Sequence, residues 1–222
     1  MKKSLTMAAL TLFVFGLACS SSEDEPTDVP GSGNIVTEAR QVSDYSSVKL
    51  LGPGLLTIDL SGSESLSIRT DENLMPFITS EVTSGQLVIG IEDAINALPS
   101  VPIVYTLTAK AMNELLVVGN SAVEFFNVNT DSLYAVLEGN GRISLAGAAS
   151  YQNVDVRLTG TYDALQLTSD IVHATVRGTA LGKLSVSDSL YATVLECGRI
   201  EFTGGADLVN IFVSECGSVR RI

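Results

Sequence analysis

The feature that most constrains the fold of this chain is an internal repeat that aligns without a gap. The 17 residues from Asp131, DSLYAVLEGNGRISLAG, match the 17 residues from Asp188, DSLYATVLECGRIEFTG, at nine positions. The two segments lie 57 residues apart, which is three times 19, and glycines recur between and beyond them at a similar spacing. A period of about 20 residues is the sign of a stacked repeat fold, in which one unit cannot bury its apolar side alone.

The repeat units read as strands rather than helices. Short runs of Val, Ile, Leu and Thr are separated by Gly and polar residues, and no window after residue 34 shows a helical period. In one run Val154 and Val156 point to one side, while Asp155 and Arg157 point to the other. This alternation is typical of half-buried strands.

We therefore predict an all-β fold, a right-handed parallel β-solenoid with coils of about 19 residues. Residues 34–110 are expected to form an irregular β region that caps its N-terminal end. A β-sandwich or antiparallel barrel would also contain short strands and frequent turns. The solenoid is favoured because stacked coils require a constant register, which a sandwich does not.

Recurrent glycines mark the expected bends of the coils. A sharp bend often needs a positive φ, which only glycine adopts without cost. The predicted bend residues are Gly52, Gly119, Gly141, Gly160, Gly178, Gly198 and Gly217.

The start of the chain carries a targeting signal. Lys2 and Lys3 precede an uncharged apolar stretch of 13 residues, too short for a transmembrane helix of about 20 residues. The stretch ends in Leu17-Ala18-Cys19, which resembles the lipobox of bacterial lipoproteins and implies cleavage before Cys19 and its acylation with palmitate-type chains. We assign residues 1–18 to a signal peptide, 19–33 to the lipidated cysteine and a flexible acidic tether, and 34–222 to the β-domain.

The composition argues against several functions. The formal charge of -12 disfavours nucleic-acid binding, which needs a basic face. With His173 as the single histidine and only three cysteines, most zinc sites lack ligands. Neither Asp131 nor Asp188 belongs to a cluster of acids, and tryptophan is absent, which argues against a sugar-stacking platform. We expect no catalytic residue, no metal and no cofactor.

The opening of the β-domain carries a family resemblance. Residues 31–50, GSGNIVTEARQVSDYSSVKL, and the glycine bends resemble the putative auto-transporter adhesin, head GIN domain family. The resemblance implies a β-helix-like domain of a Bacteroidetes lipoprotein in the cell envelope, attached to the outer membrane through its lipid. It implies an adhesin or interaction module without catalysis, with an unknown protein or glycan partner. A polysaccharide-binding or polysaccharide-cleaving β-helix protein is the alternative function.

The acidic tether also resembles a surface-export signal, so the protein faces either the medium or the periplasm.

Some further residues receive structural interpretations. Cys197 and Cys216 lie one repeat apart, so stacked coils would make them neighbours, either as a disulfide or as two free thiols. His173 is expected to be a surface or half-buried strand residue. The pair Phe125-Phe126 is expected in the core or in an end cap, and Arg142 and Arg199 in a solvated charge ladder.

Overall fold

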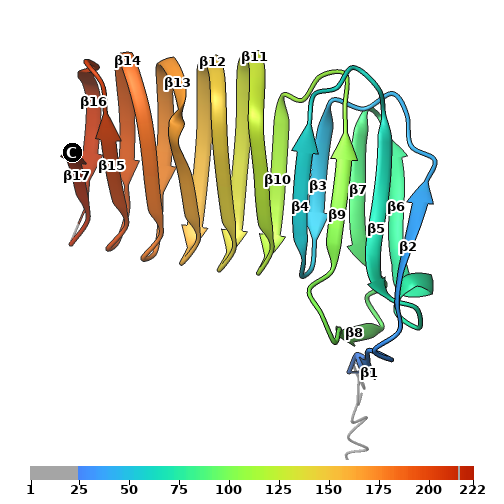
Figure 1. The fold of residues 1–222 in the computed structure, drawn as a ribbon. Coiled ribbons are helices and arrows are strands. Elements are labelled where there is room, and N and C mark those ends of the chain that lie inside the picture. The colour runs from blue at the N-terminus through green and yellow to red at the C-terminus, as the bar shows by residue number, and fades with distance from the viewer. Residues whose placement is uncertain (1–24, 215) are drawn as a thin grey trace, which may run out of the picture.

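The computed structural model describes residues 25–214 and 216–222, and these form an elongated all-β domain with two regions (Figure 1). In the N-terminal region the strands are β1 (Thr27–Pro30), β2 (Ile35–Arg40), β3 (Ser47–Leu51), β4 (Leu55–Asp59), β5 (Ser65–Asp71), β6 (Ile78–Thr83), β7 (Gln86–Ile91), β8 (Ile95–Leu98) and β9 (Val104–Thr108), with a short 3-10 helix, η1 (Met75–Phe77). In the solenoid they are β10 (Glu114–Gly119), β11 (Ala122–Gly139), β12 (Arg142–Leu158), β13 (Thr161–Val176), β14 (Leu181–Val194), β15 (Arg199–Thr203), β16 (Asp207–Val213) and β17 (Ser218–Arg221).

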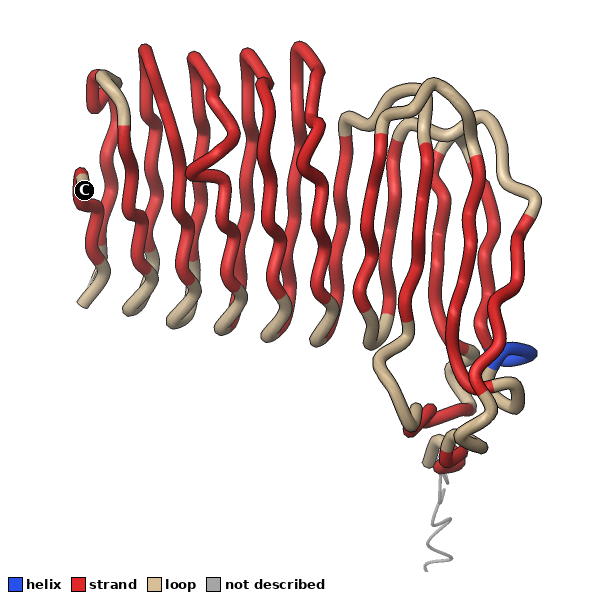
Figure 2. Tube along the Cα trace, viewed as in Figure 1, coloured by secondary structure: helices blue, strands red, loops and turns tan. Residues whose placement is uncertain are grey.

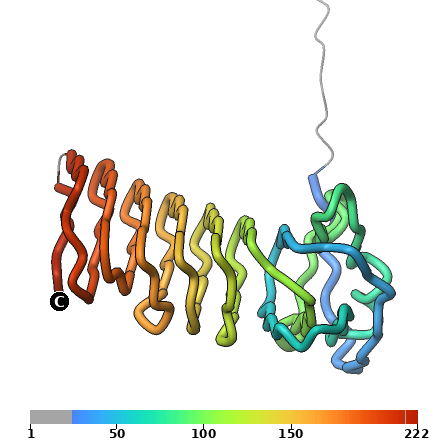
Figure 3. Tube along the Cα trace, turned by 90° about the horizontal axis from the view of Figure 1, so that it is seen from above, coloured from blue at the N-terminus to red at the C-terminus, as the bar shows by residue number. Residues whose placement is uncertain are grey.

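The solenoid is parallel and has two layers. The long strands β11 to β14 each supply a segment to both layers and bend between them, as Figure 3 shows from above. In the first layer the start of β11 pairs with β4, and in the second layer its end pairs with β10. The strands β15 and β17 complete the first layer at the C-terminal end, and β16 completes the second. The predicted parallel β-solenoid is thus confirmed.

The register explains why the internal repeat aligns without a gap. Tyr134 pairs with Asn153, Asn153 with His173, and His173 with Tyr191, which are steps of 19, 20 and 18 residues. Individual coils therefore differ in length by one or two residues, but three of them together make 57. The differences are absorbed at register shifts along β11 to β14, where one strand bulges against its neighbour.

Apolar side chains stack in columns between the two layers. Ile143 and Ile200 occupy the same column, as the sequence predicts, and both are fully buried. Burial of one such side chain contributes about 1.5–3 kcal/mol. Between them in the column are Tyr162 and Gly182. The Tyr162 hydroxyl donates to Gln152 Oε1 at 2.6 Å, and Gln152 Nε2 donates to Ser169 Oγ at 2.6 Å. These polar side chains are buried but bonded to one another, so their burial carries little penalty.

The N-terminal region is more regular than expected. Its strands continue both layers of the solenoid instead of forming an irregular cap (Figure 2). β9 adds to β4 in the first layer and β7 adds to β3 in the second, both in parallel. Beyond them β5, β2 and β6 pair antiparallel and end the two layers. The shared layers let one core run through the whole domain, because the buried residues of both regions form a single cluster.

The last part of the expected tether, residues 25–33, contains a strand, β1. β1 pairs in parallel with β8, so the folded part of the chain begins before Asn34. The following segment packs on the end of β5, where the Asp71 carboxylate accepts hydrogen bonds from Gly33 N at 2.7 Å and from Ser100 N and Oγ at 2.9 and 2.6 Å. A Cβ on Gly31 would overlap this carboxylate, which explains why the opening motif has a glycine there. Tether residues before 25, like the predicted signal peptide and Cys19, lie outside the described residues.

The predicted bend glycines divide into two columns at the edge where the second layer turns into the first. Gly52, Gly119 and Gly178 share a column with Gly139, Leu158 and Glu196, and every member has a positive φ. The column two residues later holds Gly141, Gly160, Gly198 and Gly217 and needs small residues for space. At Gly160 an added Cβ would lie 2.8 Å from the Leu137 side chain, and at Gly217 it would lie 2.7 Å from that of Val194.

The C-terminal end of the first layer is covered by an arginine. The Arg221 guanidinium lies 5.1 Å from the ring centroid of Phe202 and donates from Nη2 to the Ala206 carbonyl at 2.5 Å. A cation over an aromatic face is stabilising, and the charge discourages another strand from pairing with this edge. Arg221 therefore closes the core column that would otherwise end in open solvent.

The bend column gives a test of the coil geometry. In Gly139→Ala the new Cβ would overlap the carbonyl oxygen of Gly119, and φ is +136°. We expect the free energy of unfolding to fall by about 3 kcal/mol or more. Gly62→Ala is the matched control, because φ is +80° but no atom lies within 4 Å. It should cost only about 1 kcal/mol in urea unfolding. Equal costs for both variants would contradict the stacked-bend geometry.

The Asp71 carboxylate should make stability depend on acid pH. Hydrogen bonds from Ser100 and Gly33 hold the pKa of Asp71 below its ordinary value despite its burial. The carboxylate therefore stabilises the fold above the unfolded-state pKa, and this contribution is lost as pH falls through the folded-state pKa. Asp71→Asn should lower the melting temperature at pH 7, and the difference from wild type should shrink towards pH 3. A difference that stays constant with pH would contradict this role.

Candidate binding face

The outer surface of the second layer carries one continuous row of polar and aromatic side chains. We call it the outer row. In register from the N-terminal end it contains Gln86, Ser47, Glu114, Tyr134, Asn153, His173, Tyr191 and Asn210. At Tyr134, Asn153, His173 and Tyr191 the neighbours on either side are buried, so alternation along the strand places these four side chains outward. Ser47 is itself buried, and Asn210 lies on the largely exposed strand β16. The row crosses both regions of the domain and follows the long axis of the molecule (Figure 1).

Aromatic rings from consecutive coils meet along the outer row in what we call the aromatic ladder. Its ring centroids are 6.1 Å apart for Tyr134 and Tyr151, 5.5 Å for Tyr151 and His173, and 4.1 Å for His173 and Tyr191. The last pair is stacked at 15°, whereas the first two pairs are tilted by 56° and 46°. Tilted and stacked aromatic pairs of this kind attract each other beyond the area they bury. The ladder is therefore a rigid feature of the face.

One rung of the ladder comes from a different position in its coil. Asn153 occupies the outer row in the coil between Tyr134 and His173, and the ring there comes from Tyr151, two residues earlier. Tyr134 is 47% exposed and presents the most accessible ring of the four. The expectation of few exposed aromatic rings is met in part: Tyr134 is exposed, whereas Tyr151, His173 and Tyr191 are half-buried. The equivalence of Tyr134 and Tyr191 in the internal repeat was the available signal.

Hydrogen-bonding groups fixed by their neighbours continue the row beyond Tyr134. Gln86 Nε2 donates to Ser47 Oγ at 3.1 Å, and Ser47 Oγ donates to Glu114 Oε2 at 2.7 Å. This chain orients the Glu114 carboxylate beside Tyr134, which is its partner in register. An aromatic ring and an oriented carboxylate are therefore neighbours on one exposed strip.

Charged residues form one margin of the face. Arg157 contacts Asp155 Oδ2 at 2.8 Å and Glu138 Oε2 at 3.0 Å, and Arg177 contacts the same Asp155 oxygen at 3.7 Å. Hydrogen bonding to the Asp155 carboxylate raises the pKa of Arg157. These carboxylates are held by arginines and frame the aromatic ladder instead of facing one another.

The remaining candidates from the sequence occupy other places. His173 is half-buried on β13, as expected. Arg142 and Arg199 share an outer row of the first layer, separated by Thr161 and Leu181, and Arg142 contacts Asp163 at 2.6 Å.

Residues at the opposite bend depart in part from expectation. Phe125 is in the core as predicted, but Phe126 lies at a register shift and is 57% exposed. Asp131 and Asp188 are exposed, each on its own coil. Among residues 25–214 and 216–222, no three or more His, Cys, Asp and Glu side chains gather closely enough to hold a metal ion.

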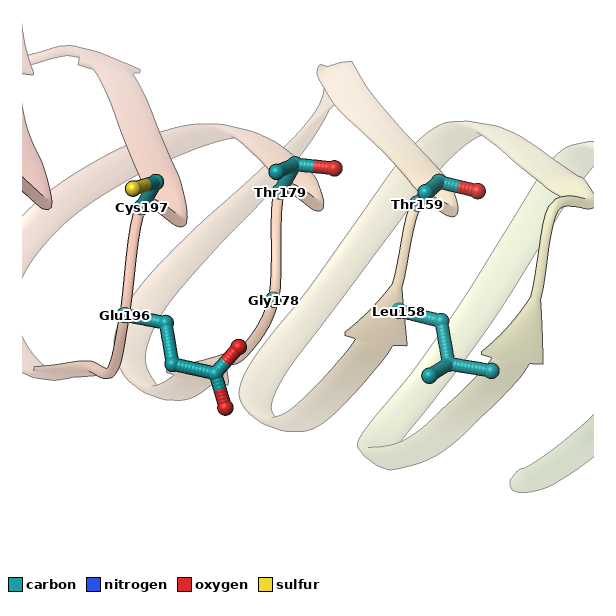
Figure 4. Close-up of a pocket in the computed structure, with 6 residues that line it drawn as sticks. All are labelled: Leu158, Thr159, Gly178, Thr179, Glu196 and Cys197. Carbon is teal, nitrogen blue, oxygen red and sulfur yellow. The ribbon is translucent and has the colours of Figure 1, made fainter.

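A shallow groove follows the bend column on the edge of the solenoid. Figure 4 shows Gly178 between the side chains of Leu158 and Glu196, so that its missing side chain leaves a hollow. Leu158 has a φ of +66° and is 57% exposed. The hydroxyl of the adjacent Thr159 already donates a hydrogen bond to Asn140 Oδ1 of the preceding coil. The groove therefore offers few free polar groups, and the outer row is the better candidate site.

Cys197 and Cys216 lie in the bend edge next to this groove. The structure joins them in a disulfide with Cα atoms 4.6 Å apart. They continue a column of like residues, in which Asn120 and Asn140 are followed by Thr159 and Thr179. The bond ties the last coil to the one before it.

The solved structures of other proteins define the fold class. The architecture is that of a two-layered parallel β-solenoid joined to antiparallel strands at one end. A putative adhesin from Bacteroides fragilis is 20% identical, with a TM-score of 0.72 and coverage of 87% of this chain and 100% of that chain. A putative adhesin from Parabacteroides merdae (17% identical, TM-score 0.55) and a putative lipid binding protein from Parabacteroides distasonis (18% identical, TM-score 0.55) each align with 88% of this chain and with 99% and 100% of their own chains. These likenesses show the fold.

The family follows from the sequence model. The model described as "Putative auto-transporter adhesin, head GIN domain" matches residues 44–206. This chain belongs to that family, as its opening motif predicts. A search of curated proteins finds no match. Within the described residues, no helix has the length and apolarity to cross a membrane.

The disulfide can be tested by replacing both cysteines with the residue that precedes them in the column. Oxidised protein should be 2 mass units lighter than reduced protein by intact mass spectrometry. The double variant Cys197→Thr/Cys216→Thr keeps a column of small polar residues but removes the bond. It should lose about 3 kcal/mol of stability for a loop of this length. Two alkylatable thiols in protein purified without reductant would contradict the disulfide.

Proposed function

We propose that this protein is a lipid-anchored adhesion module of the bacterial outer membrane that binds its partner through the outer row and does no catalysis. The family supports a role at the cell envelope or surface. The observation that carries the proposal is the aromatic ladder, a row of mutually packed rings that spans several coils and ends in the exposed Tyr134. A rigid face loses little conformational freedom on binding, and exposed tyrosines are frequent anchors in interfaces.

Lipidation of Cys19 would place the N-terminal region next to the membrane. β1 begins at Thr27, so residues 19–26 reach at most about 28 Å when fully extended. The N-terminal strands lie at one end of the domain and β16 and β17 at the other (Figure 1). The solenoid would therefore project from the membrane, with the outer row running along it.

The charge of the face supports binding over cleavage of a ligand. Asp155 and Glu138 are paired with Arg157 and Arg177, and Glu114 is oriented by Ser47. Carboxylate pairs that cleave glycosidic bonds face each other across the substrate, and one of them must be able to give up a proton. The polar groups of the outer row instead lie side by side along a strip, which suits recognition of an extended partner.

Anchoring and orientation can be tested together in cells. Wild-type protein should fractionate with the outer membrane and be degraded when protease is added to intact cells. Cys19→Ala should release it into soluble fractions, because the acyl chains supply the membrane affinity. Protection of the wild-type protein in intact cells that become sensitive after permeabilisation would place it on the periplasmic side and contradict surface adhesion.

The adhesive face can be tested with beads that carry residues 25–222. The solved Bacteroides fragilis chain is covered in full by 87% of this chain, so a domain of this extent folds by itself. Beads with wild-type protein should be retained on mucin-coated surfaces or on intact bacterial cells. Tyr134→Ala/Tyr191→Ala should reduce retention about tenfold, since it removes the exposed ring of Tyr134 and the half-buried ring of Tyr191 from the ladder.

The control for this experiment is Phe126→Ala, which removes a ring of similar exposure from the opposite bend. It should leave retention unchanged. Failure of wild-type beads to bind either surface, or equal retention of the double variant, would contradict the proposal.

A further inference from the structure

We infer that the outer row binds an extended neutral glycan whose sugar residues follow the coils one by one. This inference rests on the proposed function and names the ligand class of the same face. Its first support is the composition of the row around Tyr134, where an exposed aromatic ring lies between two side chains that donate or accept hydrogen bonds, Glu114 and Asn153. Sugars present the same combination, since a pyranose has C–H groups on its faces and hydroxyls around its edge.

The ring geometry leaves aromatic surface open to a ligand. Tyr134, Tyr151 and His173 are tilted relative to one another by 56° and 46°, so they do not form a closed stack that hides all their faces. Tyr134 is the most exposed of the three and stands at the end of the ladder, where its N-terminal neighbour in the row is Glu114. A sugar ring placed on Tyr134 would therefore have the Glu114 carboxylate within reach on the adjacent strand.

Two polar side chains flank Tyr134 on the row. The Glu114 carboxylate is fixed by Ser47 and can accept bonds from a pair of sugar hydroxyls. On the C-terminal side Asn153 is exposed and is paired in register with Tyr134, and its amide can both donate and accept. An acceptor, a ring and a donor-acceptor in sequence along one line define a saccharide subsite.

The spacing of the row fits a polymer. Successive coils lie about 4.8 Å apart, which is close to the advance of an extended glycan chain per sugar residue. The eight members of the row from Gln86 to Asn210 thus cover about 34 Å, or about seven sugar residues. The parallel register keeps these contacts in phase with the ligand, whereas a folded protein partner has no such repeat.

The charge of the domain selects a neutral ligand. The chain carries 25 acidic against 13 basic residues, and the row itself contains Glu114 but no Lys or Arg. An acidic polysaccharide would be repelled by both. The inference is therefore restricted to neutral glycans.

The inference can be tested by affinity electrophoresis and calorimetry with residues 25–222. The probes are xylan, mannan, laminarin and cellulose-derived glucan as neutral chains, and hyaluronan as an acidic chain. At least one neutral chain should retard the protein, and hyaluronan should not. Oligosaccharides of the retarding chain should bind more tightly with length up to about seven residues and then level off.

Variants connect this binding to the row. Tyr134→Ala should weaken binding about tenfold, as expected for one stacking contact. Glu114→Gln keeps the size of the side chain but weakens its acceptor, and should reduce affinity about threefold to tenfold. Phe126→Ala and Arg142→Ala, both away from the second layer, should bind as wild type. Loss of binding in these controls, or unchanged binding in Tyr134→Ala, would overturn the assignment, as would a lack of affinity for every neutral chain.

Periodate separates this inference from the proposed function. It oxidises the vicinal diols of sugars on whichever surface retains the beads, mucin or cells, and leaves the polypeptide. Retention of beads should be lost on the oxidised surface if the ligand is a glycan. Retention that survives oxidation but still depends on Tyr134 and Tyr191 would keep the adhesive face and overturn the glycan as its ligand.

Discussion

Backbone hydrogen bonding between successive coils is the interaction on which the rest of the structure depends. A parallel ladder requires that every coil return to the same phase as the one before it. The bend column meets this demand with residues of positive φ, mostly glycines, at the same place in each turn. Once the register is set, every other property of the solenoid follows column by column: which side chains are buried, which are bonded to their neighbours, and which face solvent. The register shifts allow coils of 18 to 20 residues to share one ladder.

The two ends of the solenoid protect their free sheet edges from pairing with other strands in different ways. At the N-terminal end the layers continue into β9, β5 and β2 and into β7 and β6, and the change to antiparallel pairing ends the repeat. At the C-terminal end Arg221 lies over Phe202, and Cys197 and Cys216 tie the last coil to its neighbour. The entering segment is held by Asp71, whose buried carboxylate is satisfied by hydrogen bonds. A pull on the proposed lipid anchor would therefore act first on β1 and on the contacts of Asp71.

The outer row links this architecture to the proposed role. A repeat fold places one outward side chain per coil at a fixed spacing, so any set of binding residues becomes a straight strip with a period. Such a strip is matched by a ligand that also repeats, which is why the aromatic ladder and its polar neighbours favour a polymer over a compact partner. The charged network around Arg157 lies beside the strip and fixes its margin without adding net charge to it.

The sequence by itself determined the family, the all-β class, the parallel stacking and the position of the bends. It could do so because glycines and apolar runs recur along the chain with a period of about 19 residues. It also brought Cys197 and Cys216 together, since one repeat separates them. Tertiary structure alone brought together the candidate binding face. The ladder takes its second ring from Tyr151 and not from the equivalent position, Asn153, and such a substitution across rows is visible only when side chains from neighbouring coils meet in space. Likewise, residues 34–110 lack the period of the repeat, so that only their long-range pairing shows that they extend the same two layers. Contacts between residues far apart in the chain depend on three-dimensional register, whereas the bends depend on local backbone conformation, and this difference separates what could be predicted from what could not.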